Sequence, residues 1–490
     1  MKSFNIVKLW GAVLLTFALG MSSNTARVCA AQFELPDFGS SADTVMSSAE
    51  ERRLGRAFMQ AVRKSLPVIE DPLLTDYLES LGNRLVAASG SGAGRYSFFF
   101  INQPSVNAFA GPDGHIGVYS GLVLTSQSES ELAAVVAHEI AHVTQHHLMR
   151  ALEDQGRIGP LTTALLIGAA ILGAQVDANM GAAAIAGLQA AALQRQINFT
   201  RQNEEEADRV GISTLAAADF DPFAMPGFFE RMAKAGRTYE NSAPEFLRTH
   251  PVTSNRIADA LARAEHFGYK QRPDDLRFHL VRARLREHSL KNPEKAIGHF
   301  KANLNAGRYR NKSAETYGYA LSLARGGQVT RARDLTRDLL ELHPNQAEFI
   351  ILDARLDAKA GSHADAIRKL QTAVGLRPDS MPLRFAYAQV LMDASKPTRA
   401  FETLEDAVRW RSGSAPVYEL MSNAALKSGK KAATHRYRAE KLYIQGDLEP
   451  AIRQLELALK TPGISFHDAS KVQVRLDELK TEQEEIEKKR

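Results

Sequence analysis

The chain has 490 residues, of which 44% are hydrophobic and 24% are charged, as is usual for globular proteins with well-developed cores. This length predicts roughly three domains. The formal net charge of +5 is small for the length, and no RNA- or DNA-binding motif is present, so we expect no nucleic-acid partner.

Residues 1–31 have the pattern of a secretory signal peptide. Two lysines precede an apolar run at residues 9–21, which is too short to span a bilayer comfortably, and small residues suit cleavage near Ala30 or Ala31. The single cysteine, Cys29, lies in this segment, and the valine before it disfavours the alternative of a lipoprotein. The sequence therefore predicts export and a mature chain that needs no disulfides in an oxidising compartment.

The segment from residue 32 to about residue 100 is expected to be mainly helical. Residues 50–58 and 72–81 both carry apolar side chains at three- and four-residue spacing, which predicts amphipathic helices. Residues 96–101 are apolar and aromatic and predict a buried strand.

A second strand is predicted at residues 115–119, after the turn signal Asp113-Gly114. This strand precedes the helix that carries the histidine motif described next. We therefore expect its edge to hydrogen-bond an extended peptide substrate. The alternative is an ordinary structural hairpin.

The sequence His-Glu-Ile-Ala-His at residues 138–142 is the strongest chemical signal in the chain. On a helix, His138 and His142 share one face, and two imidazole nitrogens at about 2.0–2.1 Å from an ion are half of a tetrahedral zinc site. Glu139 is placed to take a proton from a zinc-bound water. With 14 histidines in the chain, roughly 0.03 chance matches are expected, so a surface helix with incidental histidines is disfavoured.

The flanks of this motif predict a buried helix. Ser128 and Glu131 form a capping-box pattern at its start, and residues 132–136 are apolar. His146 follows His138 by two helical turns, about 12 Å of rise, which is too far for a shared metal ion. We expect both His146 and His147 to be exposed.

A third ligand must come from elsewhere in the chain. Zinc peptidases with a further histidine six residues after the second are excluded, because that position is Leu148. In the run Asn-Glu-Glu-Glu-Ala-Asp, Glu204 and Asp208 lie on one helix face, so one carboxylate can bind zinc while the other orients a ligand histidine. Spacing alone does not separate Glu204 from Glu205, and a solvated acidic face is the alternative.

Between the two predicted metal-binding helices lies an apolar run at residues 158–174, followed by an Ala- and Gly-rich run at residues 180–193. The first run contains Pro160 and is marginal for a transmembrane helix. We favour a mobile apolar lid beside the active site, able to make peripheral contact with a membrane or with unfolded clients.

Four motifs, in this order, resemble the M48 family of zinc metallopeptidases over roughly residues 45–270. They are NAFAGPDGHIGVYSGL, HEIAH, EEEAD and THPVTSNRI. The resemblance implies an α+β zincin-type peptidase domain, which we assign to residues 32–270. It also implies zinc metalloendopeptidase activity with one Zn²⁺ per chain.

The same resemblance implies the roles of individual residues. The metal ligands would be His138, His142 and Glu204. Glu139 would be the catalytic base, and Asp208 would take part in catalysis by orienting a ligand.

Two further residues lie in the last of these motifs. In the exported M48 members with a repeat domain, which this stretch resembles, the histidine equivalent to His250 occupies the fourth zinc position and holds the enzyme latent. The resemblance therefore implies that His250 is a regulatory fourth ligand. Arg256 is a candidate donor to the oxyanion or, alternatively, a structural salt-bridge residue.

From about residue 275 the chain repeats with a period of 34 residues, which is the tetratricopeptide period. Small residues recur at this interval at Gly327, Gly361, Ser395 and Gly429. We predict a tetratricopeptide-repeat solenoid of four to six units at residues 275–480, and a charged tail at residues 481–490 that frays. The expected fold is thus mainly α, with an α+β zincin-type peptidase domain followed by an α-helical repeat solenoid.

This order of segments resembles the M48 peptidases of the Gram-negative periplasm that act in outer-membrane protein quality control. The resemblance implies a periplasmic location and degradation of unfolded or stalled protein substrates. It also implies chaperone-like client binding by the repeats and contact with the outer-membrane barrel-assembly machinery. The alternative is an assembly chaperone or adaptor that acts through its repeats and has a latent metal site.

Overall fold

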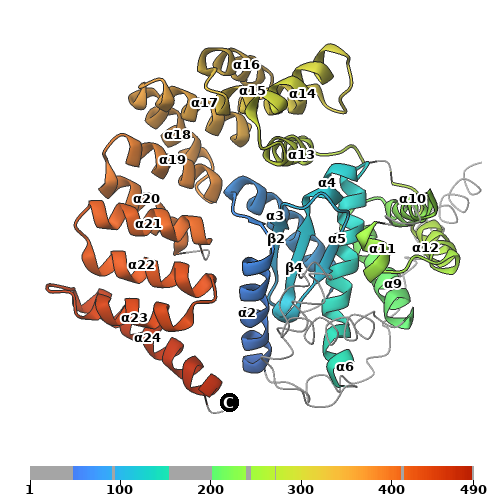
Figure 1. The fold of residues 1–490 in the computed structure, drawn as a ribbon, viewed down its shortest axis with the longest axis horizontal. Coiled ribbons are helices and arrows are strands. Elements are labelled where there is room, and N and C mark those ends of the chain that lie inside the picture. Colours follow the sequence, from blue (N-terminus) through green and yellow to red (C-terminus); the bar gives the residue numbers. More distant parts are fainter. Residues whose placement is uncertain are drawn as a thin grey trace, which may run out of the picture. The chain divides into compact units, whose positions relative to one another are not determined.

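The structure is a computed structural model that describes residues 48–90, 94–153, 201–238, 244–270, 272–409 and 413–487. The predicted signal peptide and the apolar run at residues 158–174 lie outside the described residues and stay predictions. The described part of the chain is mainly helical, with one small sheet (Figure 1).

The sheet has four strands in the order β1-β2-β4-β3. The strands are β1 (Val68–Ile69), β2 (Ser97–Ile101), β3 (Ala108–Ala110) and β4 (His115–Tyr119). β4 pairs in parallel with β2 and antiparallel with β3. The two strands predicted from the sequence are confirmed, but the expectation of a free edge on β4 is wrong, because β4 is paired on both sides. The edge strands of the sheet are β1 and β3.

The turn between β3 and β4 is the short 3-10 helix Pro112–Gly114. Gly114 has φ +68°, and a Cβ there would lie 1.9 Å from the carbonyl oxygen of Arg95. This position therefore needs glycine, which explains why the Asp113-Gly114 signal marks the turn.

Helices cover both faces of the sheet. The peptidase part contains α2 (Ser48–Ser65), α3 (Pro72–Ala88), α4 (Ser120–Thr125), α5 (Glu129–Thr144), α6 (His147–Glu153), α9 (Arg201–Ala217), α10 (Ala224–Thr238), α11 (Glu245–Thr249) and α12 (Ser254–Phe267). Phe99 and Ile101 of β2 pack with α2, whereas Phe98 and Phe100 pack in the larger core with α3 and α5. The alternation of one strand thus separates two cores, and the helices predicted at residues 50–58 and 72–81 are confirmed.

Helix α5, which carries the His-Glu-Ile-Ala-His motif, is buried from Glu129 to His142. The Ser128 hydroxyl accepts the amide of Glu131 at 3.2 Å, so the predicted cap is confirmed. The Glu131 carboxylate accepts the amide of Gln127 at 2.6 Å, whereas a capping box would use the amide of Ser128.

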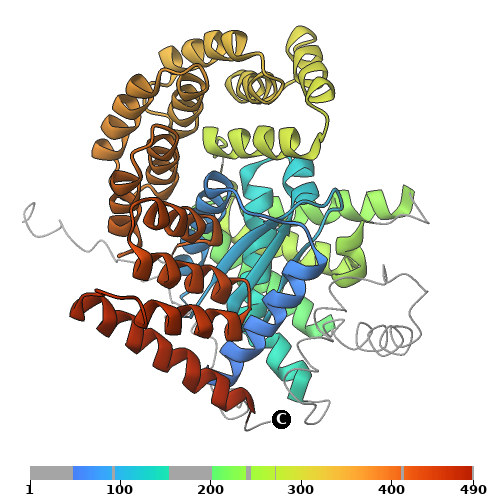
Figure 2. The same cartoon turned by 60° about the vertical axis from the view of Figure 1, so that its left-hand side comes forward.

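The second half of the described chain is a succession of paired helices (Figures 1 and 2). They are α13 (Leu276–Ser289), α14 (Pro293–Asn305), α15 (Lys312–Arg325), α16 (Val329–Leu342), α17 (Ala347–Lys359), α18 (His363–Leu376), α19 (Met381–Asp393), α20 (Pro397–Val408), α21 (Ala415–Lys427), α22 (Lys431–Ile444), α23 (Leu448–Leu459) and α24 (Phe466–Glu487). The residues of the 34-residue repeat lie in turns with positive φ, from 57° at Ser395 to 84° at Gly361. The predicted repeat architecture is confirmed.

The charged tail differs from expectation. Instead of fraying from residue 481, the chain continues α24 as far as Glu487. Arg56 of α2 forms an ion pair with Glu482 of this helix and donates to the hydroxyl of Tyr443 on α22. These contacts explain why a strongly charged segment stays helical.

Ion pairs also join α3 to the first repeat helix, α13. Arg284 Nε donates to Asp71 Oδ2 at 2.8 Å, and Arg277 Nη2 lies 2.9 Å from Asp76 Oδ2. Across the described ranges, every helix is too short or too polar to cross a membrane.

Candidate metal centre

The helices α5 and α9 are distant in sequence but pack against each other. A Cβ at Gly211 of α9 would lie 3.3 Å from the backbone nitrogen of His138 and 2.9 Å from Met225 Cε. Glycine therefore permits the close approach of the two helices. This approach places Glu204 and Asp208, which lie about two turns and one turn before Gly211 respectively, against the histidines of α5.

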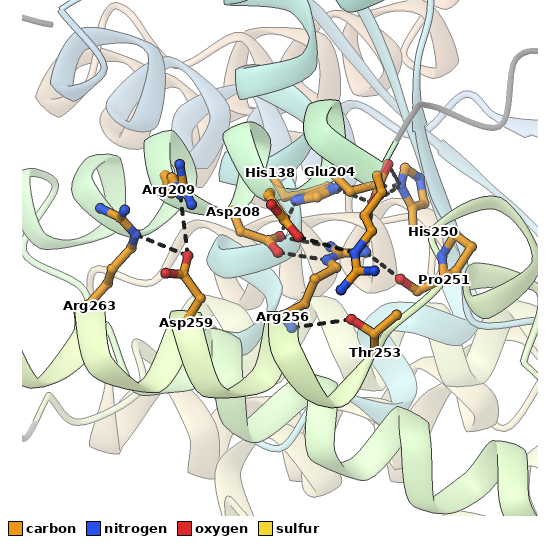
Figure 3. Close-up of polar contacts among 12 residues, drawn as sticks. His138, Glu204, Asp208, Arg209, His250, Pro251, Thr253, Arg256, Asp259 and Arg263 are labelled. Carbon is orange, nitrogen blue, oxygen red and sulfur yellow. Dashed lines mark hydrogen bonds and ion pairs between the residues drawn. The ribbon is translucent and has the colours of Figure 1, made fainter.

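Four buried side chains converge at this point: His138, His142, Glu204 and His250. His250 follows α11, where its backbone amide donates to the carbonyl of Phe246 at 2.7 Å. Its imidazole ring stacks on the Phe246 ring with centroids 4.9 Å apart. The short helix and the ring contact together orient His250 toward α5 (Figure 3).

The distances between these side chains fit a tetrahedrally coordinated metal ion. His138 Nε2 lies 3.0 Å from His142 Nε2 and 3.4 Å from His250 Nδ1. Glu204 Oε1 lies 3.4 Å from His142 Nε2 and 3.1 Å from His250 Nδ1. Ligands at zinc-bond lengths on a tetrahedron are separated by about 3.3–3.4 Å, so these four residues can hold a zinc ion.

The ambiguity between the two neighbouring glutamates is decided by geometry. Glu204 is 2% exposed and lies in the cluster. Glu205 Oε1 instead lies 3.3 Å from Arg201 Nε at the helix surface. Only the Glu204 carboxylate can therefore reach the histidines.

Arg256 of α12 holds the acidic side of the centre together (Figure 3). Its Nε and Nη2 atoms donate to the two carboxylate oxygens of Asp208 at 2.7 and 2.8 Å. Its Nη1 atom lies 2.8 Å from Glu204 Oε2 and donates to the carbonyl of Pro251 at 2.7 Å. Because the guanidinium is fully engaged and 1% exposed, the structure favours the salt-bridge alternative for Arg256 over the oxyanion donor.

Asp208 lies between Arg256 and a candidate ligand. Its Oδ1 atom is 3.0 Å from His138 Nδ1, the nitrogen that faces away from the cluster. A carboxylate in this position fixes the ring orientation of a ligand histidine. The position matches the orienting role that we expected for Asp208.

His147 corrects an expectation, because its side chain is fully buried, whereas His146 is exposed. The backbone at His146 has φ +52°, which ends α5 and turns the next residue back toward it. His147 Nδ1 lies 2.8 Å from His142 Nδ1, and His147 Nε2 lies 3.0 Å from Glu206 Oε2. With Nε2 of His142 directed at the cluster, its Nδ1–H can donate to His147, which donates in turn to Glu206.

Glu139 is the unmatched charge of the centre. Its side chain is 0% exposed, and neither carboxylate oxygen has a well-formed hydrogen bond within the described residues. The nearest cation-forming group is His250, whose Nε2 lies 3.6 Å from Glu139 Oε1. Burial raises the pKa of Glu139. Since an unpaired buried carboxylate is costly, this group is poised to bind a water or a proton.

Burial and neighbouring carboxylates shift the pKa values of the two motif histidines in opposite directions. Burial lowers the pKa of His142 to about 3, which keeps this imidazole neutral, as a metal ligand must be. Burial also opposes a charge on His138, but Asp208 and Glu204 outweigh it and raise the pKa of His138 to about 10. A metal ion bound by His138 would therefore displace a proton from this ring. Despite burial, His250, His138 and His142 hold the pKa of Glu204 well below its usual range.

Comparison with known proteins decides the family. The model of "Peptidase family M48" matches residues 72–264. The Beta-barrel assembly-enhancing protease of Yersinia pestis is 34% identical to this chain over 483 residues, which are 97% of each chain. The chain belongs to the M48 peptidase family. It is therefore a metalloendopeptidase, and the resemblance inferred from its four motifs is confirmed.

Two further relatives show how far the similarity extends. The Beta-barrel assembly-enhancing protease of Escherichia coli K12 is 34% identical over 450 residues, 92% of each chain. The Mitochondrial metalloendopeptidase OMA1 of Schizosaccharomyces pombe is 31% identical over 183 residues, 37% of this chain and 51% of that one. The M48 bacterial relatives thus match both halves of the chain, whereas the mitochondrial relative matches a limited part.

Proposed function

We propose that this protein is an exported zinc endopeptidase that hydrolyses peptide bonds in unfolded or misassembled proteins during outer-membrane protein assembly. The observation that carries the proposal is the convergence of His138, His142 and Glu204 beside the buried carboxylate of Glu139. The names of the bacterial relatives support the process, and the repeats support chaperone-like binding of clients. The N-terminal pattern supports export to the periplasm, with cleavage near Ala30 or Ala31.

The residues divide the work of hydrolysis. Zinc held by His138, His142 and Glu204 supplies the Lewis acidity that activates water and polarises the peptide carbonyl. Glu139 accepts a proton from the attacking water and returns it to the leaving amine. Burial raises the pKa of Glu139, which strengthens this carboxylate as a proton acceptor. Asp208 keeps His138 in the required orientation.

Edge strand β3 is the proposed support for the substrate backbone. Its outer side is unpaired among the described strands, since the sheet ends there. Strand β3 contacts α5, the helix that carries the proposed base Glu139. An extended peptide that adds to this edge would pass the catalytic carboxylate.

We also propose that His250 holds the enzyme latent. Catalytic zinc sites keep one position for water or substrate, whereas sites closed by four protein ligands are structural. His250 Nδ1 lies 3.4 Å from His138 Nε2, and this proximity supports His250 as a fourth ligand. A His250→Ala variant should therefore digest casein faster than the wild type. An unchanged rate would rule out this role.

The closed site is also the specific observation in favour of the alternative function, an assembly adaptor that acts through its repeats. A Glu139→Gln variant separates the two functions in a barrel-assembly assay. Lost activity supports the peptidase, and full activity supports the adaptor. Contact with the barrel-assembly machinery and peripheral membrane contact through residues 158–174 belong to the same proposal.

The most direct test combines metal analysis with casein digestion. We expect one zinc ion per chain and loss of digestion when a chelator removes it. Glu139→Gln should keep the zinc and lower the rate by about 10²–10⁴, the usual contribution of a general base. Digestion that persists without metal would contradict the proposed chemistry.

A further inference from the structure

An open cavity of about 470 Å³ lies among α13, α14 and the start of α15, outside the metal centre. Four arginines line it: Arg282, Arg286, Arg308 and Arg310. We call it the basic cavity and define it by these four residues. The function proposed above does not use it.

None of the four guanidinium groups is paired with a carboxylate in the described part of the chain. Arg282 donates to the carbonyls of Ser126 and Leu124 at 2.9 and 3.1 Å, and Arg310 donates to the carbonyl of Ser126 at 3.0 Å. These acceptors are uncharged. Within the described residues, Arg286 and Arg308 make no side-chain hydrogen bond or ion pair. Two guanidinium groups are therefore available to a ligand.

The other arginines of α13 behave differently. Arg277 pairs with Asp76 and Glu348, and Arg284 pairs with Asp71. One helix thus carries two arginines with acidic partners and two arginines, in the basic cavity, without them. The lack of acidic partners is therefore specific to the arginines that line the cavity and is not shared by the other arginines of α13.

The positive charges repel one another. Burial, followed by the charges of Arg310 and Arg286, lowers the pKa of Arg282 to about 10, although Asp274 and Glu131 oppose the shift. Glu315 is the carboxylate in the lining, but it accepts a hydrogen bond from the Asn303 amide at 2.8 Å, and burial raises its pKa. The lining therefore holds four arginines against one carboxylate, and an entering anion would neutralise part of this excess positive charge.

We propose that the basic cavity binds a carboxylate-bearing, acidic stretch of the polypeptide substrate. This inference rests on the proposed peptidase function and names a feature of its substrates. Two free guanidinium groups match the planar geometry of carboxylates, which they can bind in bidentate fashion. A volume of about 470 Å³ suits a few side chains. The carboxylate of Glu315 opposes a phosphate dianion more than a side-chain carboxylate.

The cavity also adjoins the helix of the metal centre. The carbonyls held by Arg282 and Arg310 belong to residues just before Ser128, the N-cap of α5. An acidic stretch bound in the cavity would thus lie against the start of the helix that carries His138 and His142. Substrate recognition and the proposed catalytic residues would then share one rigid element.

The test is a binding measurement on the full chain that does not depend on proteolysis. The probe is a fluorescein-labelled hexaglutamate peptide, read by fluorescence anisotropy with the Glu139→Gln variant so that cleavage is slow during the measurement. We expect saturable binding that weakens as salt is added. Adding Arg286→Glu and Arg308→Glu together should weaken binding at least tenfold.

A matched control changes the net charge equally at a distance from the cavity. Arg337 and Arg368 are exposed and pair with acidic residues three positions earlier on their own helices. Arg337→Glu with Arg368→Glu should change binding less than twofold. If both double variants weaken binding equally, the effect is due to net charge alone and the proposal is overturned.

Two more measurements complete the test. Arg286→Gln with Arg308→Gln avoids reversed charges, and if the charge-reversed variant fails to fold, this pair must still weaken binding. Displacement of the probe by inorganic phosphate at lower concentration than by free glutamate would overturn the choice of a carboxylate. Because binding is measured without hydrolysis, a protein that binds but never cleaves would refute the peptidase function alone.

Discussion

The metal centre and the basic cavity both gather charged side chains, but they balance the charge in opposite ways. At the metal centre, Arg256 is 1% exposed and contacts both Asp208 and Glu204. In the basic cavity, four arginines share uncharged acceptors or have none within the described residues. In this comparison the matched charges maintain structure, and the unmatched charges are the ones that we propose bind a ligand.

The same contrast between matched and unmatched charges is found within the metal centre, where Glu139 is the unmatched carboxylate. Its neighbours Asp208 and Glu204 are each engaged by Arg256, whereas both oxygens of Glu139 lack a well-formed hydrogen bond in the described part of the chain. The matched carboxylates hold the site, and the unmatched one is the proposed base. Each prediction below tests whether matched and unmatched charges differ as this comparison requires.

The largest effect is expected for Arg256→Met. The change leaves Asp208 buried without its partner, and breaking a buried pair in this way costs about 3–5 kcal/mol. Urea unfolding of the metal-free protein should show the loss. Arg263→Met is the matched control, because this arginine lies on the same helix and pairs with Asp259 at the surface, 40% exposed, where pairs contribute about 0–1 kcal/mol. Similar losses in both variants would refute the comparison.

A smaller effect is expected at the ion pair that joins the two regions. Asp71 caps α3, and Asn caps helices equally well, so Asp71→Asn removes the charge opposite Arg284 and keeps the cap. Burial opposes the charge, but Arg284 outweighs it and lowers the pKa of Asp71. We expect a loss of about 1.5–3 kcal/mol at pH 7.

The pH dependence of this loss has a defined sign. A carboxyl group whose folded pKa is lowered stabilises the fold above its unfolded pKa of about 3.9, and the stabilisation disappears as pH falls through the folded value. Unfolding curves of wild type and Asp71→Asn should therefore differ at pH 7 and converge below about pH 4. A difference that stays constant down to pH 3 would exclude the ion pair as its cause.

The next prediction concerns His147, which supports a ligand without contacting the cluster. His147→Phe removes the contact to His142 Nδ1 and keeps the ring volume, so zinc affinity should fall about 10–100-fold. Competition with a chromophoric chelator measures the affinity. The control is His146→Asn, because Asn tolerates the positive φ of this exposed position. Equal affinities of the two variants would remove His147 from the metal centre.

His147 also shows where prediction from sequence stops. His138, His142 and the acidic face of α9 were predictable because helical spacing is local, and the repeats were predictable because each unit contacts its neighbours. The choice between Glu204 and Glu205 needed the family resemblance. The position of His147 depends on a positive φ at His146, and no periodicity encodes that turn.

Two further features depend on the tertiary arrangement and could not be predicted from the sequence. The pairing of β4 on both sides follows from strand order, which alternation along one strand cannot give. The basic cavity is invisible in a net charge of +5, because its arginines are balanced by acidic residues elsewhere in the chain. Local patterns gave the elements, and only their packing revealed which charges are left without partners.

The smallest effect on stability is expected in the basic cavity, where it is the most informative. Arg286→Ala and Arg308→Ala each remove a guanidinium that has no side-chain partner among the described residues, so the free energy of unfolding should change by no more than about 0.5 kcal/mol. The loss of repulsion toward Arg282 gives Arg286→Ala a slight gain. Binding of the hexaglutamate probe should fall in both variants. Arg286 and Arg308 would then be dispensable for folding but required for binding, whereas Arg256 is required for folding. A marked loss of stability in Arg286→Ala or Arg308→Ala would show that these arginines, like Arg256, maintain structure.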